Sequence, residues 1–231
     1  MKKLMNLLFY FSKFELILWT FSIIFITVSF ILFDRANYLT LAASVIGVTS
    51  LMFNSKGNPF GQFLMIIFSG IYGIISYSFA YYGEMITYLG MTAPMALTAL
   101  ITWLKNPYKG QRAEVKINRL KCSELIFMTI LTCVITFIFY FILKFFNTAN
   151  LFISTVSVTT SFAAAYLTFR RSPYFALLYA ANDIVLIIMW ILAAVEDISY
   201  VSVIICFVMF LVNDLYCFVN WLKIEKRQRN L

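Results

Sequence analysis

The chain has 231 residues, of which 62% are hydrophobic and only 12% are charged, and its formal net charge is +8. A water-soluble domain has about twice that share of charged residues and has no interior large enough for so much apolar surface. The composition therefore excludes an ordinary soluble globule and predicts an integral membrane protein. Lipid cannot satisfy backbone amides, so spanning segments must be helices or a closed barrel, and apolar runs of about 20 residues favour helices.

Eight apolar segments follow one another along the chain, and we expect each to form a transmembrane helix. The first resembles a signal peptide, but it is long and no small-residue cleavage site follows it, so we interpret it as a retained helix. The second is the shortest and is also compatible with a re-entrant segment. The segments cover residues 14–33, 38–54, 61–82, 85–104, 123–143, 150–169, 173–194 and 198–222.

The basic residues give the orientation independently. If both termini face the cytoplasm, all 18 lysines and arginines lie in cytoplasmic segments except Arg35 and Lys144. Cytoplasmic loops of membrane proteins carry such an excess of positive charge. We therefore expect a multi-pass protein of the plasma membrane with both termini inside. Its net charge then reflects topology and attraction to anionic lipid, so the sequence predicts no nucleic-acid partner.

A weak internal repeat divides the chain. Residues 83–88 read GEMITY and residues 195–200 read VEDISY, while Trp-Leu-Lys occurs at 103–105 and again at 221–223. The order of these matches predicts two parallel three-helix repeats joined by a linking helix and preceded by one extra helix. The predicted divisions are the extra helix (1–37), the first repeat (38–104), the basic loop and linking helix (105–149), the second repeat (150–223) and a basic tail (224–231).

Polar residues deep in the seventh segment are the first candidates for a solute site. Asn182 and Asp183 lie near its middle, where a carboxylate is costly unless it faces a wet cavity or a partner. The alternative is a hydrogen bond between helices, which polar residues in lipid commonly make. Trp190 lies two turns further on and suits a flat ring, although tryptophan also anchors helices at the membrane interface.

The last segment carries a second polar stripe. Asn213, Tyr216 and Asn220 are spaced i, i+3, i+7 and so share one face that lipid disfavours. Asp214 and Trp221 form a neighbouring stripe, but we interpret Trp221 as an interface anchor rather than a ligand.

Hydroxyl residues mark two further segments. Ser69, Tyr72 and Ser76 repeat the same spacing in the third segment. The sixth segment is rich in serine and threonine, for which close helix packing is the expected role. Together these amides, hydroxyls, carboxylates and rings suit a polar, ring-containing solute.

Signatures of enzymes and cofactors are missing from the sequence. The chain has no histidine, and its four cysteines show no metal-ligand spacing. We find no glycine-rich phosphate loop and no nucleophile elbow. Asp183 and Asp214 are a conceivable acid pair for intramembrane hydrolysis, but neither lies in a known aspartyl protease motif. We therefore predict no catalytic residue, no metal and no cofactor.

At these same positions the sequence resembles the PnuC family of vitamin transporters. The similar segments span most of residues 38–223 and are VIGVTSLMFNSKGNPFG at 45–61, YGIISY at 72–77 with YYGE at 81–84, AANDIVLIIMW at 180–190 and VNDLYCFVNWLK at 212–223. The resemblance implies two three-helix bundles joined by a linking helix. It also implies facilitated uptake of nicotinamide riboside, with a cytosolic kinase as functional rather than physical partner.

The resemblance also implies roles for particular residues. Asn182, Asn213 and Tyr72 match family positions, so we expect them to line one pocket and contact the solute, with Asp183, Trp190 and Tyr216 as further candidates. The sequence departs from the family pattern at Phe68, Phe175, Leu178 and Cys217. Nicotinamide riboside is therefore the first expectation, and thiamine, riboflavin or a deoxynucleoside are alternatives.

Two other functions remain open from the sequence. A substrate-binding subunit of a multi-component uptake system is one, since Ala176 and Ala180 fit the small-residue docking face of such subunits. A membrane-embedded enzyme is the other. A homo-oligomer is compatible with either.

The orientation gives a first prediction. Single cysteines introduced between residues 105 and 121 should resist a membrane-impermeant maleimide in intact cells and react after permeabilisation. Labelling from outside would contradict the assignment of this loop to the cytoplasm.

Overall fold

The computed structural model describes residues 10–78 and 82–230. Within these residues, eight helices are long and apolar enough to cross a membrane, which confirms the predicted number and most boundaries to within a few residues. The second is a continuous helix, so the re-entrant alternative is wrong. The spans are α2 (Lys13–Phe33), α3 (Tyr38–Ser55), α4 (Phe60–Ser78), α5 (Tyr82–Ile86) continuing through η1 (Thr87–Thr92) into α6 (Ala93–Lys105), α7 (Cys122–Phe145), α8 (Leu151–Phe169), α9 (Tyr174–Ala194), and η2 (Ile198–Tyr200) with α10 (Val201–Arg229).

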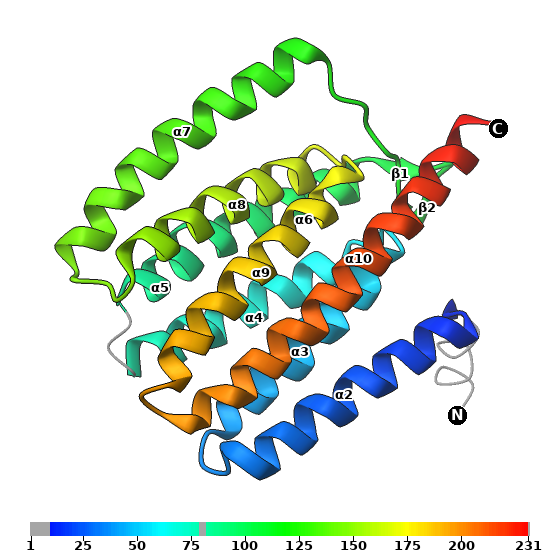
Figure 1. Ribbon diagram of the computed structural model, residues 1–231. Helices are drawn as coiled ribbons and strands as arrows, with labels where there is room; N and C mark the ends of the chain where they lie inside the picture. The colour runs from blue at the N-terminus through cyan, green and yellow to red at the C-terminus, as the bar shows by residue number, and fades with distance from the viewer. Residues whose placement is uncertain (1–9, 79–81, 231) are drawn as a thin grey trace.

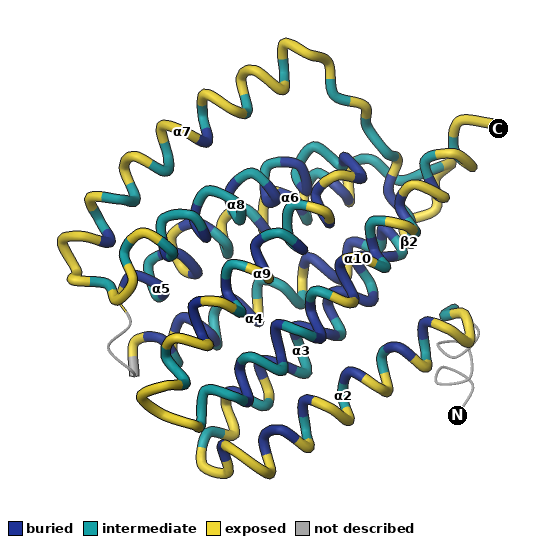
Figure 2. The backbone as a smooth tube through the Cα atoms, viewed as in Figure 1, coloured by how far each residue is buried: buried dark blue, intermediate teal, exposed yellow. Residues whose placement is uncertain are grey.

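The helices form one bundle with α2 and α7 at its margins (Figure 1). α7 packs mainly on α8, and α2 packs on α3 and α10. Only 6% of the most apolar stretch of α7 is buried within the protein. Figure 2 shows exposed residues along both marginal helices, while the helices between them are largely buried. Because the exposed side chains are mostly large and apolar, lipid is the solvent they fit.

The fourth span contains a π-helical turn with a local cause. Pro94 stands at the start of α6 and has no N–H with which to continue an α-helical ladder. The N–H of Ala93 instead reaches the carbonyl of Tyr88, five residues back. Such a wide turn rotates the preceding residues relative to a regular helix. Thr87 and Tyr88 are thereby buried in the bundle.

The basic loop after α6 contains a short hairpin that we did not predict from the sequence. Strands β1 (Pro107–Tyr108) and β2 (Gln111–Val115) pair antiparallel. Lys109 and Gly110 join them with φ of 49° and 78°, as a two-residue hairpin turn requires.

The end of the last helix holds this hairpin. Gln228 donates from Nε2 to the carbonyl of Val115 over 3.0 Å and to Glu114 over 2.8 Å. Arg227 pairs with Glu114, and Arg119 pairs with Glu225 over 2.9 Å. These contacts extend α10 to Arg229, beyond its predicted end at residue 222 and through most of the expected basic tail.

At this basic end of the bundle, two tryptophans connect helices that are far apart in the sequence. Trp221 donates its indole N–H to the carbonyl of Asn54 over 2.8 Å, and Trp103 donates to the carbonyl of Thr168 over 2.9 Å. Both side chains are fully buried and their ring centroids lie 5.4 Å apart. The prediction that Trp221 anchors the helix at the membrane interface is therefore wrong, because the ring is enclosed by protein.

These bonds give a prediction on stability. Trp221→Phe keeps the aromatic packing but removes the donor, so a buried carbonyl loses one partner at a cost of about 1–2 kcal/mol. The thermal unfolding temperature in detergent should fall. Trp19→Phe is the matched control, because that half-buried indole bonds only the hydroxyl of Thr49, over 3.1 Å. Equal shifts for both variants would contradict the role given to Trp221.

Candidate functional site

A cavity lies in the middle of the bundle, between α3, α4, α5 with the η1 segment, α8, α9 and α10. Its volume is about 60 Å³, which is room for a few water molecules. Six of its lining residues carry amides or carboxyls, namely Asn54, Gln62, Glu84, Asn182, Asp183 and Asp214. Six others are aromatic, namely Phe68, Tyr88, Phe175, Tyr179, Phe207 and Phe210. The cavity thus combines hydrogen-bonding groups with ring surfaces.

Asn182 is held in one orientation by its neighbours on α8. Its Oδ1 accepts hydrogen bonds from the hydroxyls of Thr160 over 2.8 Å and Ser157 over 3.1 Å. With the oxygen occupied, the side chain presents its N–H₂ group, which donates to no described residue. From the sequence we expect the hydroxyls of α8 to serve helix packing. Those of Ser157 and Thr160 also orient the amide of Asn182.

Asp183 and Asp214 form a carboxyl pair across α9 and α10. Their carboxyl groups lie within hydrogen-bonding reach of each other, and the two residues are only 4% and 2% exposed. A carboxyl that carries a proton can therefore donate it to the other. Apart from this contact, no described residue donates a hydrogen bond to either group. The structure thus brings together the two aspartates that the sequence suggests as an acid pair.

Asn54 and Gln62 form a further polar pair in the wall, near the turn between α3 and α4. Gln62 donates from Nε2 to Oδ1 of Asn54 over 2.9 Å, and the two residues are each 3% exposed. Gly61 permits this approach, since a Cβ at that position would overlap the side chain and backbone of Asn54. The sequence analysis missed both residues. The only available signal was uncharged polar side chains at the ends of apolar segments.

Tyr72 and Trp190 meet in a different place. Both line a small cavity of about 30 Å³ near Asp34 and Tyr200, at the end of the bundle opposite to the hairpin. The ring of Tyr72 packs at a tilt against that of Tyr88, with centroids 4.4 Å apart. Because Tyr88 lines the central cavity, Tyr72 lies one ring behind its wall.

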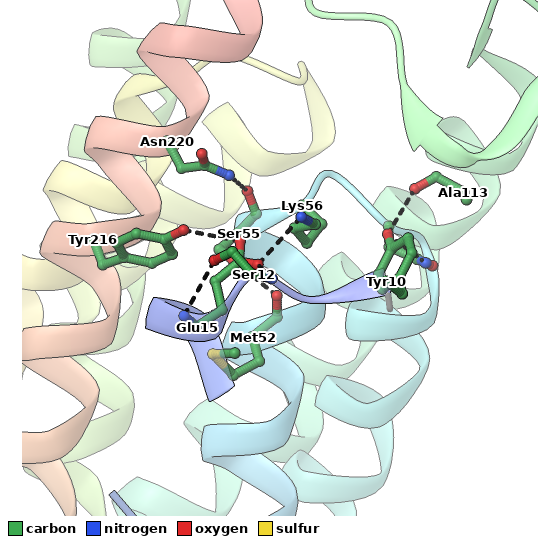
Figure 3. Close-up of polar contacts among 10 residues, drawn as sticks. Tyr10, Ser12, Glu15, Met52, Ser55, Lys56, Ala113, Tyr216 and Asn220 are labelled. Atoms are coloured by element: carbon green, nitrogen blue, oxygen red, sulfur yellow. Dashed lines mark hydrogen bonds and ion pairs between the residues drawn. The ribbon is translucent and has the colours of Figure 1, made fainter. Parts of the chain in front are cut away.

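Asn213 and Tyr216 are directed at α2 instead of the cavity. Asn213 donates to the hydroxyl of Ser22 over 2.9 Å, and Tyr216 donates to Glu15 over 2.8 Å. Figure 3 shows Tyr216 and Glu15 in one cluster with Lys56, whose Nζ lies 3.2 Å from Glu15. The stripe on α10 does point inward, as predicted. The structure places these two residues apart from Asn182 because α2 occupies that face of α10.

The family model described as nicotinamide mononucleotide transporter matches residues 37–223. The chain belongs to this family. The match begins after the end of α2 and includes every residue that lines the central cavity.

Curated relatives and a solved structure agree with this membership. The nicotinamide riboside transporter PnuC of Neisseria mucosa is 26% identical over 199 residues, covering 84% of this chain and 76% of the relative. The protein of the same name from Haemophilus influenzae is 23% identical over 192 residues, covering 83% and 82%. A crystal structure of the vitamin B3 transporter PnuC shares the fold, with a TM-score of 0.81, 24% identity and 94% of each chain covered.

The polar wall gives a prediction on packing. Gly61→Ala should destabilise the protein by roughly 1–3 kcal/mol, because the added methyl group displaces Asn54 and its bond to Gln62. Gly70→Ala in the same helix is the control, since a Cβ there meets nothing within 4 Å. The control should be neutral or slightly stabilising, because alanine favours helix over glycine. Thermal unfolding in detergent measures both, and a neutral Gly61→Ala would refute the close approach.

Proposed function

We propose that this protein carries nicotinamide riboside across the plasma membrane by facilitated diffusion, and that a cytosolic kinase then traps the solute. The observation that carries the proposal is the central cavity of a family member, lined by an oriented amide at Asn182, carboxyls and aromatic rings. Amides suit the carboxamide and ribose of such a solute, and rings suit its flat base. The names of both curated relatives support this solute class.

The charge of the cavity favours the riboside over the mononucleotide named in the family description. Glu84, Asp183 and Asp214 line it, and among the described lining residues there is no lysine or arginine. A phosphate group carries negative charge at neutral pH and is normally bound by basic side chains or helix N-termini. The described lining therefore offers a phosphorylated solute no basic side chain as counter-charge.

The size of the cavity bears on the mechanism. A drug-sized solute needs a site of roughly 300 Å³ or more, several times the 60 Å³ present. The described conformation is thus closed, and we infer that the aromatic side chains lining the cavity move aside when solute enters.

We further propose that the two three-helix repeats are residues 38–104 and 150–223, related by an axis along the bundle. Equivalent turns support this arrangement. Asn58 donates its N–H to the carbonyl of Phe53 over 3.0 Å, and Ser172 donates to Leu167 over 3.0 Å. The residue directly before each donor, Gly57 or Arg171, has a positive φ. The reciprocal tryptophan bonds link the last helix of each set to the first helix of the other.

A binding-only subunit is the less favoured function. Its sequence support was a docking face made by Ala176 and Ala180, but these residues are 0% and 3% exposed. Neither is available on the surface for a partner.

Uptake by the purified protein tests the proposal directly. Liposomes that contain only this protein should equilibrate labelled nicotinamide riboside without ATP or an ion gradient, and should retain it when a riboside kinase and ATP are enclosed. Binding without flux would instead support the receptor-subunit function. Protein-free liposomes give the background.

A second experiment assigns the site. Asn182→Ala should weaken riboside binding by about 1–3 kcal/mol, the cost of leaving a buried polar partner unsatisfied, which is about one to two decades in dissociation constant. Calorimetric titration measures it. Asn213→Ala is the matched control, since its amide contacts α2 and its loss should lower thermal stability with little effect on affinity. The opposite pattern would move the site to the α2 side of α10.

A further inference from the structure

Acidic residues form a series from one end of the bundle to its centre. A second cavity, of about 80 Å³, lies at the end opposite to the hairpin and is lined by Glu84, Trp190 and Glu196. Glu84 also lines the central cavity, together with Asp183 and Asp214. The two cavities therefore share Glu84 as part of their common wall. Among the described residues that line either cavity, no lysine or arginine balances these acids.

The acids inside the bundle lack the partners that buried acids normally have. Glu84 accepts no hydrogen bond from a described residue, and the Asp183–Asp214 pair has only its internal bond. Glu15 is equally buried at 1% exposed, yet it has Lys56, Tyr216 and the backbone of Ser12 as partners (Figure 3). Burial of negative charge without a partner is expensive. Glu15 has partners that serve the fold, whereas no described residue outside the aspartate pair offers the cavity acids a partner that explains their burial.

The surroundings of the acids fit an organic cation better than a metal ion. No three acidic or sulfur side chains among the described residues gather closely enough to hold a metal. The cavity instead offers aromatic rings, among them Tyr88, Tyr179 and Phe207, and the faces of such rings attract organic cations. A flat, positively charged ring satisfies both the carboxyls and the aromatic wall.

We propose that this site selects its solute by a permanent positive charge on the ring, with the Asp183–Asp214 pair and Glu84 as the counter-charges. The inference rests on the proposed function and adds a specificity rule to it. Nicotinamide riboside meets the rule, because glycosylation of its ring nitrogen makes a pyridinium cation. Glu84, shared by both cavities, attracts the same charge on the way to the centre.

The test compares two solutes of nearly the same shape. Nicotinamide riboside is cationic, whereas its reduced dihydropyridine form is neutral and keeps the ribose and the carboxamide. Binding to the full-length protein in detergent should favour the cation by roughly tenfold or more, as a charge pair at low effective dielectric provides. Salt should reduce this preference only weakly, because the pair is buried.

Variants then locate the charge. Replacing only one aspartate leaves the other carboxyl able to act as counter-charge, so both are replaced together. Asp183→Asn with Asp214→Asn removes both carboxyls with little change of shape and should bring the affinity ratio of the two solutes close to one. Glu84→Gln is a second, independent variant and should lower the ratio in part. Asp197→Asn is the control, an exposed acid at the same end that lines neither cavity, and should leave the ratio unchanged.

Different results would contradict charge selection and the proposed function. Equal affinity of the unaltered protein for both riboside forms would overturn charge selection while leaving riboside transport standing. An unchanged ratio in the folded double variant and in Glu84→Gln would also overturn it. Failure of the unaltered protein to bind either form would overturn the proposed function itself. If the double variant does not fold, the ratio of the unaltered protein and the Glu84→Gln variant decide.

Discussion

A helix that ends inside a membrane protein leaves carbonyl groups without helical partners, and lipid offers none. α3 and α8 end in this way at the hairpin side of the bundle, and each receives an indole N–H from the opposite half, through Trp221 and Trp103. The exchange fixes the two halves against each other at one end. The ring of Phe175 lies 4.8 Å from that of Trp221 by centroid and also lines the central cavity. The cavity wall is therefore in direct contact with this pair of tryptophan bonds, through Phe175.

Above these tryptophan bonds, the cavity wall is made of side chains from six of the eight spans, and few hydrogen bonds from described residues hold its acids. The η1 turn contributes Thr87 and Tyr88 from a stretch whose backbone bonds are already irregular. A fixed end and a loosely bonded middle are the arrangement that a carrier needs, since solute entry must move side chains without separating the halves.

The sequence was sufficient for the spans and insufficient for the partners of their polar residues. Apolar length and basic loops locate helices because lipid imposes one rule on every span. That rule says only that a polar residue turns away from lipid. Asn213 and Asp214 are neighbours that both do so, yet one meets α2 and the other meets the cavity. Glu84 appears in the sequence only within two short matches, because nothing in its surroundings there shows that the carboxyl is buried beside the cavity. Trp221 is predicted to be an interface anchor because a sequence alone shows neither how deeply its ring is buried nor which carbonyl accepts its N–H.

The helix α2 has a consequence for how this family varies. It lies outside the region matched by the family model, yet its buried Glu15 and Ser22 bind Lys56, Tyr216 and Asn213. Without that cover, the amide of Asn213, which lies in the middle of α10, would face hydrocarbon. Relatives that lack a counterpart of α2 should therefore carry an apolar side chain at the position of Asn213. The presence of the helix and the polarity of that position should be inherited together.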